Sequence, residues 1–247
     1  PDLILSFDDG YYDFYEYALP LLVKHNLSAN HNIVNVCAEN QTTIWTEKLN
    51  VLFEHFQAKG KKVSINLGDR KTSVNDFNGN WMSFYLHTFK SLLNIPIVER
   101  NSILDQLQAE AGIAATRKMM NWDEIKECSA NQIEIGSHTF SHDSLGTISE
   151  SDKLKMEILG SKSDLEAKLG KEVNVLALPN GQTGKLADEI ISESGFKFVL
   201  YVDDELNTLP LNTSSLTHIS RINLVDEPFP QMALRMEQFH KLLRKYV

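Results

Sequence analysis

The chain has 247 residues, of which 42% are hydrophobic and 23% are charged, and its formal net charge is −9. This length fits one large domain, and the acidic balance argues against nucleic acid or an anionic membrane surface as a partner. No run approaches the roughly 20 consecutive apolar residues that a membrane-spanning helix needs. Two cysteines, Cys37 and Cys128, are too few for a disulfide scaffold. Compartment and oligomeric state stay open on this evidence.

Short apolar runs alternate with helical patterns in both the first and the second half of the chain. The runs at 3–7, 29–36, 132–135, 173–178, 198–202 and 218–224 predict strands. Helical spacing predicts helices near 14–25, 122–128, 153–169, 186–194 and 231–246, with Asn121 as an N-cap and Gly170 and Gly195 as helix ends. The first residues already have a strand pattern, and we find no signal peptide. Strands that alternate with helices predict a parallel α/β sheet, and at this length a barrel or an open barrel.

Residues 41–117 have a different pattern and are predicted to be a mostly helical insertion within a single domain that spans 1–247. Helices are expected near 44–56, 84–93 and 98–107, an exposed strand at 62–67, and a polar loop at 69–80. The segment carries two histidines, His55 and His87, and neither has a second ligand type at metal-binding spacing. We expect it to supply no metal ligand. A packed structural insert is the simplest interpretation, and a lid or an oligomer contact is the alternative.

Polar clusters follow three of the predicted strands. They are Asp8-Asp9-Gly10, the run from His138 to His142, and the turn at 179–181. Function in parallel α/β folds gathers at the carboxyl ends of the strands, so three such clusters together indicate a site.

The histidine pair and the aspartate pair complement each other chemically. His138 and His142 are four residues apart, a spacing that suits a divalent ion. Two histidines at the surface or in a helix contact, without a metal, would show the same spacing. Asp8 and Asp9 repel each other at the end of a buried strand unless a cation lies beside them, although Asp-Asp-Gly is also an ordinary turn. One aspartate and two histidines make a three-ligand catalytic set, and the second aspartate would remain a free base.

These motifs, Ser6-Phe7-Asp8-Asp9-Gly10 followed by the His138–His142 run, resemble the polysaccharide deacetylase family (NodB homology domain, carbohydrate esterase family 4). The resemblance covers about residues 1–40 and 119–225. It implies a distorted, incomplete (β/α) barrel. It also implies a divalent metal ion, with Zn²⁺ as the first choice and Co²⁺, Ni²⁺ or Mn²⁺ as alternatives.

The resemblance assigns a role to each matching residue. Asp8 would be the general base, and Asp9, His138 and His142 the metal ligands. Hydroxyls beside the ligands, at positions 139 and 141, would orient the imidazoles. The implied reaction is metal-assisted hydrolysis of N-acetyl groups on amino sugars of a polysaccharide or oligosaccharide, so the expected partner is an N-acetylated glycan.

The third family motif departs from the usual pattern. Ala177 stands where the family has an arginine that holds the base. Pro179-Asn180-Gly181 resembles instead a branch with a Pro-x-Gly form, in which these residues would bind substrate, although Asn-Gly is also a plain turn.

The last predicted strand carries two further candidate catalytic residues. Arg221 is predicted to replace the missing arginine and to contact Asp8, because a guanidinium can hold a carboxylate in two places. Leu216-Thr217-His218 matches the Leu-x-His motif that carries the catalytic acid in the family. A histidine at the start of a strand that only faces solvent would give the same match. In a regular strand His218 and Arg221 point to opposite faces, so the two assignments compete.

Two other functions remain open from the sequence. The same set of residues could hydrolyse an amide bond in a substrate that contains no sugar, which would make the protein a non-carbohydrate amidohydrolase. The missing arginine also fits a catalytically weak, carbohydrate-binding pseudoenzyme, although an intact base beside a complete ligand set argues against it. The sequence identifies neither the glycan nor its linkage.

Overall fold

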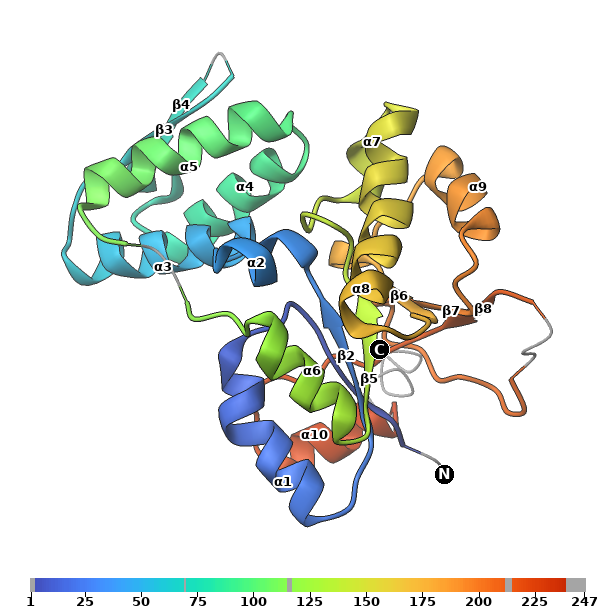
Figure 1. The fold of residues 1–247 in the computed structure, drawn as a ribbon. Coiled ribbons are helices and arrows are strands. Elements are labelled where there is room, and N and C mark those ends of the chain that lie inside the picture. The colour runs from blue at the N-terminus through green and yellow to red at the C-terminus, as the bar shows by residue number, and fades with distance from the viewer. Residues whose placement is uncertain (1–2, 69, 115–116, 212–214, 239–247) are drawn as a thin grey trace, which may run out of the picture.

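Six parallel strands form the central sheet of the computed structural model, which describes residues 3–68, 70–114, 117–211 and 215–238 (Figure 1). The strands are β1 (Leu5–Phe7), β2 (Ala29–Ile33), β5 (Ile133–Ser137), β6 (Val175–Ala177), β7 (Phe198–Leu200) and β8 (Thr217–Ile219). Their order is β1-β2-β5-β6-β7-β8, and every neighbouring pair is parallel. The sheet curls into an incomplete barrel with β1 and β8 at its two ends, which confirms the predicted fold class.

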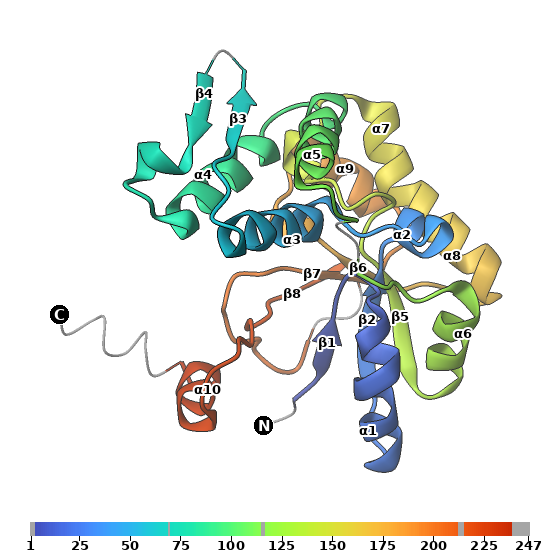
Figure 2. The same ribbon diagram turned by 90° about the vertical axis from the view of Figure 1, so that its left-hand side faces the viewer.

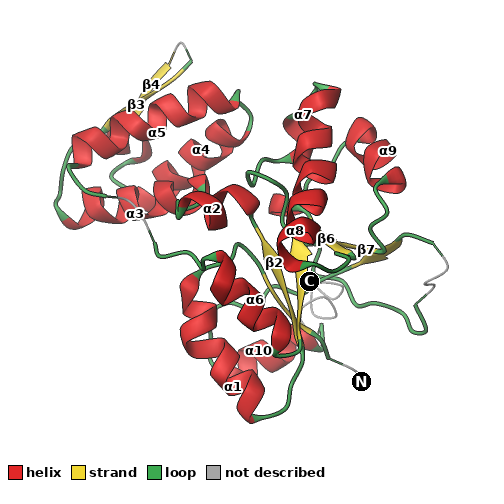
Figure 3. Ribbon diagram, in the orientation of Figure 1, coloured by secondary structure: helices red, strands yellow, loops and turns green. Residues whose placement is uncertain are grey.

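Helices pack against one face of this sheet (Figure 3). They are α1 (Leu19–Lys24), α2 (Asn35–Asn40), α6 (Trp122–Ala130), α7 (Ser151–Lys155), α8 (Ser161–Leu169) and α9 (Lys185–Glu193). Near the end of the described chain, α10 (Phe229–Met236) lies apart from these helices and contributes no side chain to the main core (Figure 2). The main hydrophobic core joins strand residues such as Ile135, Leu176 and Val199 to helix residues such as Ile125 and Leu165. Because strand side chains alternate between faces, the intervening residues point to the other, concave face.

The insertion forms a lobe beside the sheet (Figure 2). It contains α3 (Trp45–Ala58), a hairpin of β3 (Ser64–Leu67) and β4 (Arg70–Ser73), a 3₁₀ turn (Val74–Phe77), α4 (Trp81–Leu93) and α5 (Ile97–Ala111). Its apolar side chains form a hydrophobic cluster of their own, whose members all lie between residues 45 and 113. The insertion therefore has a core separate from that of the barrel.

Several element boundaries differ from the sequence prediction for local reasons. Part of the predicted loop at 69–80 pairs as β4, and the capping box of Ser73 and Asp76 starts the 3₁₀ turn. The strand predicted at 29–36 ends at Ile33 because α2 begins at Asn35. The helix predicted at 231–246 begins earlier, at Phe229, and positions 239–247 lie outside the described residues. None of the helices in the described ranges has the length and apolar character to cross a membrane.

Candidate active site

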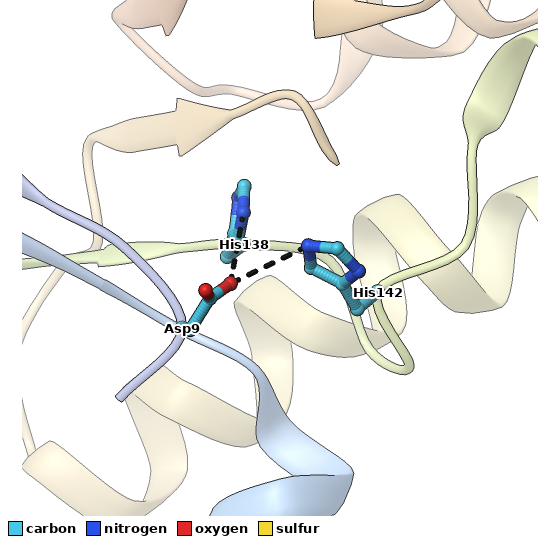
Figure 4. Close-up of side chains that lie close together, drawn as sticks. All are labelled: Asp9, His138 and His142. Carbon is cyan, nitrogen blue, oxygen red and sulfur yellow. Dashed lines mark ion pairs between the residues drawn. The ribbon is translucent and has the colours of Figure 1, made fainter. Parts of the chain in front are cut away.

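Three side chains converge at the carboxyl ends of β1 and β5 (Figure 4). Asp9 follows β1, and His138 and His142 lie in the loop after β5. Asp9 Oδ1 is 3.4 Å from Nε2 of His138 and 3.4 Å from Nε2 of His142. Among the described residues, these three form the one group whose ligand atoms could hold a metal ion, and neither His55 nor His87 belongs to it.

The spacing of these atoms fits a small divalent cation. Tetrahedral Zn²⁺ with bonds of about 2.0–2.1 Å separates its ligand atoms by about 3.3–3.4 Å, which is the spacing of the two pairs that include Asp9, and all three ligand atoms lie within 4.8 Å of one another. Asp9 Oδ1 is buried and has no hydrogen-bond partner within the described structure. Burial, with the negative charges of Asp8 and Glu47, raises the pKa of Asp9 to about 6 although His138 lies beside it. The pocket is therefore short of positive charge, which a bound cation would supply.

The two imidazoles are held in different ways. His138 Nδ1 lies 2.9 Å from the carbonyl oxygen of Ala177, which can only accept, so Nδ1 donates and the Nε2 lone pair faces Asp9. Burial and the neighbouring His138 hold the pKa of His142 well below its ordinary value, so His142 is neutral, as a metal ligand must be. His142 Nδ1 has no hydrogen-bond partner among the described residues, and its backbone N–H donates to Thr139 Oγ1.

Asp8 is held from two sides through one of its oxygens. Arg221 Nη1 and Asn32 Nδ2 each donate to Asp8 Oδ1 at 2.8 Å. Burial opposes the charge on Asp8, but His138, Arg221 and the hydrogen bonds outweigh it and hold the pKa of this carboxyl well below its usual range. Asp8 Oδ2 lies 3.9 Å from His138 Nε2 and therefore faces the candidate cation site. The predicted contact between Arg221 and Asp8 is present.

A buried amide on β2 was missed by the sequence analysis. Besides Asp8, Asn32 contacts Asn30, which in turn accepts from Ser6 Oγ at 2.7 Å. Asn32 has room only because residue 136 on the neighbouring strand is glycine: a Cβ there would lie 2.1 Å from Asn32 Oδ1. Polar residues at alternate positions of a strand buried on both faces were the available signal, since such groups need partners.

The profile of the polysaccharide deacetylase family matches residues 98–199. This segment contains both histidines of the candidate metal site, and it starts inside the insertion. This segment, which is less than half of the chain, is similar to the polysaccharide deacetylase family. Asp8, Asp9 and Arg221 lie outside the matched segment. No curated protein matches the chain.

Solved structures of deacetylases share the fold. The deacetylase PplD of Streptococcus pyogenes, in complex with acetate, is 16% identical, with a TM-score of 0.57 over 94% of this chain and 69% of that one. IcaB from Ammonifex degensii is 16% identical, with a TM-score of 0.52 over 94% and 72% of the two chains. A de-N-acetylase from Aggregatibacter actinomycetemcomitans is 15% identical, with a TM-score of 0.51 over 94% and 74%. At this level of identity, the similarity is one of fold.

The last strand and the residues after it place the two candidate catalytic residues, His218 and Arg221, on opposite sides of the sheet. β8 ends at Ile219, so Arg221 lies beyond it and reaches Asp8 from the concave face. His218 pairs in register with Val199, a residue of the core that faces the helices, and its ring packs 5.2 Å from that of Tyr201. The structure does not bring His218 to the site. Its position argues against the predicted role as proton donor.

The turn at 179–181 follows β6, the strand whose Ala177 carbonyl holds His138. Pro179 is buried, whereas Asn180 is exposed in a left-handed conformation with φ of 56°. Gly181 also has a positive φ, and a Cβ there would lie 3.3 Å from Val202. Asn180 therefore lies at the edge of the sheet where the carboxyl end of β6 is found. The predicted membership of the Pro-x-Gly branch stays a prediction.

The hydroxyls expected to orient the imidazoles support the loop instead. Thr139 Oγ1 accepts the backbone N–H of His142 at 3.1 Å. Ser141 donates its backbone N–H to Glu157 at 2.9 Å and its hydroxyl to Glu157 and to Asp143. Both side chains therefore fix the backbone that carries His142.

Proposed function

We propose that this protein is a metal-dependent hydrolase that removes N-acetyl groups from amino sugars of a polysaccharide or oligosaccharide. The observation that supports it most is the arrangement around Asp8. This carboxylate is kept ionised and oriented beside three side chains whose spacing fits a divalent cation. The similarity of residues 98–199 to the polysaccharide deacetylase family supports the class of substrate.

Asp9, His138 and His142 would hold the cation, and their carboxylate and imidazole donors favour Zn²⁺. When bound, the cation supplies Lewis acidity, which polarises an amide carbonyl and makes water easier to deprotonate. The protein contributes the neutral, correctly turned imidazoles: the Ala177 carbonyl fixes the tautomer of His138.

Asp8 is the proposed general base. Arg221 and Asn32 both bind Oδ1, so Oδ2, which faces the candidate cation site, is the oxygen that receives the proton from the attacking water. Hydrolysis of the amide consumes one water and gives acetate and a free amine. The proton that Asp8 accepts therefore balances the proton that the leaving nitrogen gains.

The turn at Pro179-Asn180-Gly181, which is exposed at Asn180, is the proposed substrate-binding loop. It follows the strand that orients His138, so a glycan lying along the strand ends would meet the Asn180 amide, which can both donate and accept hydrogen bonds. Removal of this amide in Asn180→Ala should raise KM and leave the metal content unchanged.

Acetate release from a panel of N-acetylated glycans tests the function, with the metal removed by a chelator and then restored. We expect release that stops without metal, returns with Zn²⁺ and is abolished in Asp8→Asn. Turnover of simple amides but of no glycan would favour a non-carbohydrate amidohydrolase. Glycan binding without any acetate release would favour a pseudoenzyme.

A further inference from the structure

The insertion is joined to the loop that carries His142 by a buried ion pair. Arg100 of α5 donates through Nη2 to Oδ1 of Asp143, the residue directly after His142. Arg100 is 5% exposed and Asp143 is 2% exposed. Salt screens such a shielded ion pair much less than a pair on the surface, and removal of one partner would leave the other as an uncompensated buried charge.

The core of the insertion fixes the position of the guanidinium. Arg100 Cζ lies 4.6 Å from the centroid of the Trp45 ring, on α3. Trp45 in turn stacks on Phe89 of α4, with ring centroids 5.4 Å apart and an interplanar angle of 17°. Three helices of the insertion therefore determine where the positive charge meets Asp143.

The loop that receives this charge needs outside support. Thr139 and His142 have φ values of 65° and 62°, a left-handed conformation that residues other than glycine rarely adopt. His142 Nδ1 has no hydrogen-bond partner among the described residues, so the ring is placed by its backbone and by packing against His138, with ring centroids 4.8 Å apart. Glu157 holds one side of the loop through Ser141, and Arg100 holds the other through Asp143.

We propose that Arg100 is a positioning residue: by holding Asp143 it fixes His142 as a metal ligand and couples the folded insertion to metal affinity. This proposal rests on the proposed function. In this view the insertion completes the metal centre without contributing a ligand. A buried ion pair that only stabilises the fold would give the same contacts, so the test must measure the metal site itself.

The experiment is a Zn²⁺ titration of metal-free protein against a chromophoric chelator, with wild type, Arg100→Met, Arg100→Lys and Asp143→Asn. Loss of the partner that orients a ligand typically lowers metal affinity about 10–100-fold, and we expect this range for Arg100→Met and Asp143→Asn. Arg100→Lys keeps the charge but loses the guanidinium that lies over the Trp45 ring, so it should give an intermediate loss. In Asp143→Asn, adding Arg100→Lys should cause little further loss.

Asp105→Asn is the matched control. Asp105 is also on α5, where it pairs with Lys48 of α3 at 2.7 Å, and this pair has no contact with the His142 loop among the described residues. Its Zn²⁺ affinity should equal that of wild type. Visible absorption of the Co²⁺-loaded proteins gives a second readout, and we expect the spectrum to change in Arg100→Met and in Asp143→Asn but to stay that of wild type in Asp105→Asn.

Wild-type Zn²⁺ affinity in both Arg100→Lys and Asp143→Asn would overturn the proposal, whatever their thermal stability, and would leave the proposed function intact. If Arg100→Met fails to fold, these two milder variants decide the question. Failure of the wild type to bind Zn²⁺ would overturn both the positioning role and the proposed metal-dependent function.

Discussion

Replacement of Arg221 by lysine is the sharpest test of how the base is held. Arg221 Nη1 donates to Asp8 Oδ1 at 2.8 Å and to Ser6 Oγ at 3.2 Å, while Nε donates to the Tyr201 carbonyl at 3.3 Å. Lysine keeps the positive charge but has a single nitrogen, which cannot reach these groups from both ends of a planar fork. The carboxylate should therefore lose its orientation more than its charge.

The expected effect follows from the hydrogen bond that is lost. A hydrogen bond to a charged group is worth about 1.5–3 kcal/mol, and about 1.4 kcal/mol in the barrier corresponds to a tenfold change in rate. Arg221→Lys should thus lower kcat/KM for acetate release by about 10–100-fold. Metal content should not change, because none of the three candidate ligands contacts Arg221 by a hydrogen bond.

The assay is steady-state acetate release with metal analysis of the same samples. His218→Ala is the control, since this ring lies on the helix-facing side of β8 beside Tyr201, and its activity should stay near that of wild type. Full activity in Arg221→Lys together with a crippled His218→Ala would refute the reasoning and would make His218 the acid.

Four further predictions follow from the site and its surroundings. His142→Ala should lose bound Zn²⁺ and activity together, and full occupancy in metal analysis would remove this residue from the ligand set. Asp8→Asn should keep its metal and lose about 10²–10⁴-fold in turnover; loss of metal here would mean that the roles of the paired aspartates are reversed. Gly136→Ala should displace the Asn32 side chain, because the new Cβ would lie 2.1 Å from its Oδ1, and should reduce turnover with metal retained, whereas an unchanged kcat would contradict this role for the amide. Burial lowers the pKa of His31 to about 4, and its Nε2 accepts the Gly10 N–H. The neutral side chain therefore makes its full contribution to the free energy of unfolding above pH 6.5. About 3 kcal/mol of this contribution is lost as the pH falls to 4, because the unfolded chain binds the proton first. Urea unfolding of metal-free His31→Gln should show a correspondingly weaker pH dependence than wild type, and parallel curves would contradict it.

Local patterns were sufficient to predict the strands of the central sheet and the polar clusters that contain the candidate ligands, whereas the family resemblance was needed to assign Asp9 rather than Asp8 as a ligand. The Asp8-Asp9 pair and the two histidines each follow a short apolar run, and parallel strands bring such ends to one edge. The partner of Asp8 was also predictable, because the missing family arginine left a charge to be balanced and Arg221 was on a strand expected beside the first one.

Contacts that depend on side-chain packing between distant segments could not be predicted. The Asn32 side chain fits only because residue 136, on the neighbouring strand, is glycine. The sequence around either residue alone does not show this dependence. Arg100 and Asp143 are likewise joined only by the docking of the insertion. The face on which His218 lies depends on the register of β8 against β7, which a two-letter motif does not contain.

The left-handed conformation of Asp9, with φ of 78°, has an evolutionary consequence. The backbone of Asp9 has an energetically unfavourable conformation, and its buried Oδ1 has no hydrogen-bond partner among the described residues. Asparagine tolerates the same backbone and carries no charge, so Asp9→Asn should make the metal-free protein more stable. For a chain selected only for a stable fold, Asp9→Asn would therefore be an improvement, so an aspartate at this position favours selection for what the site does.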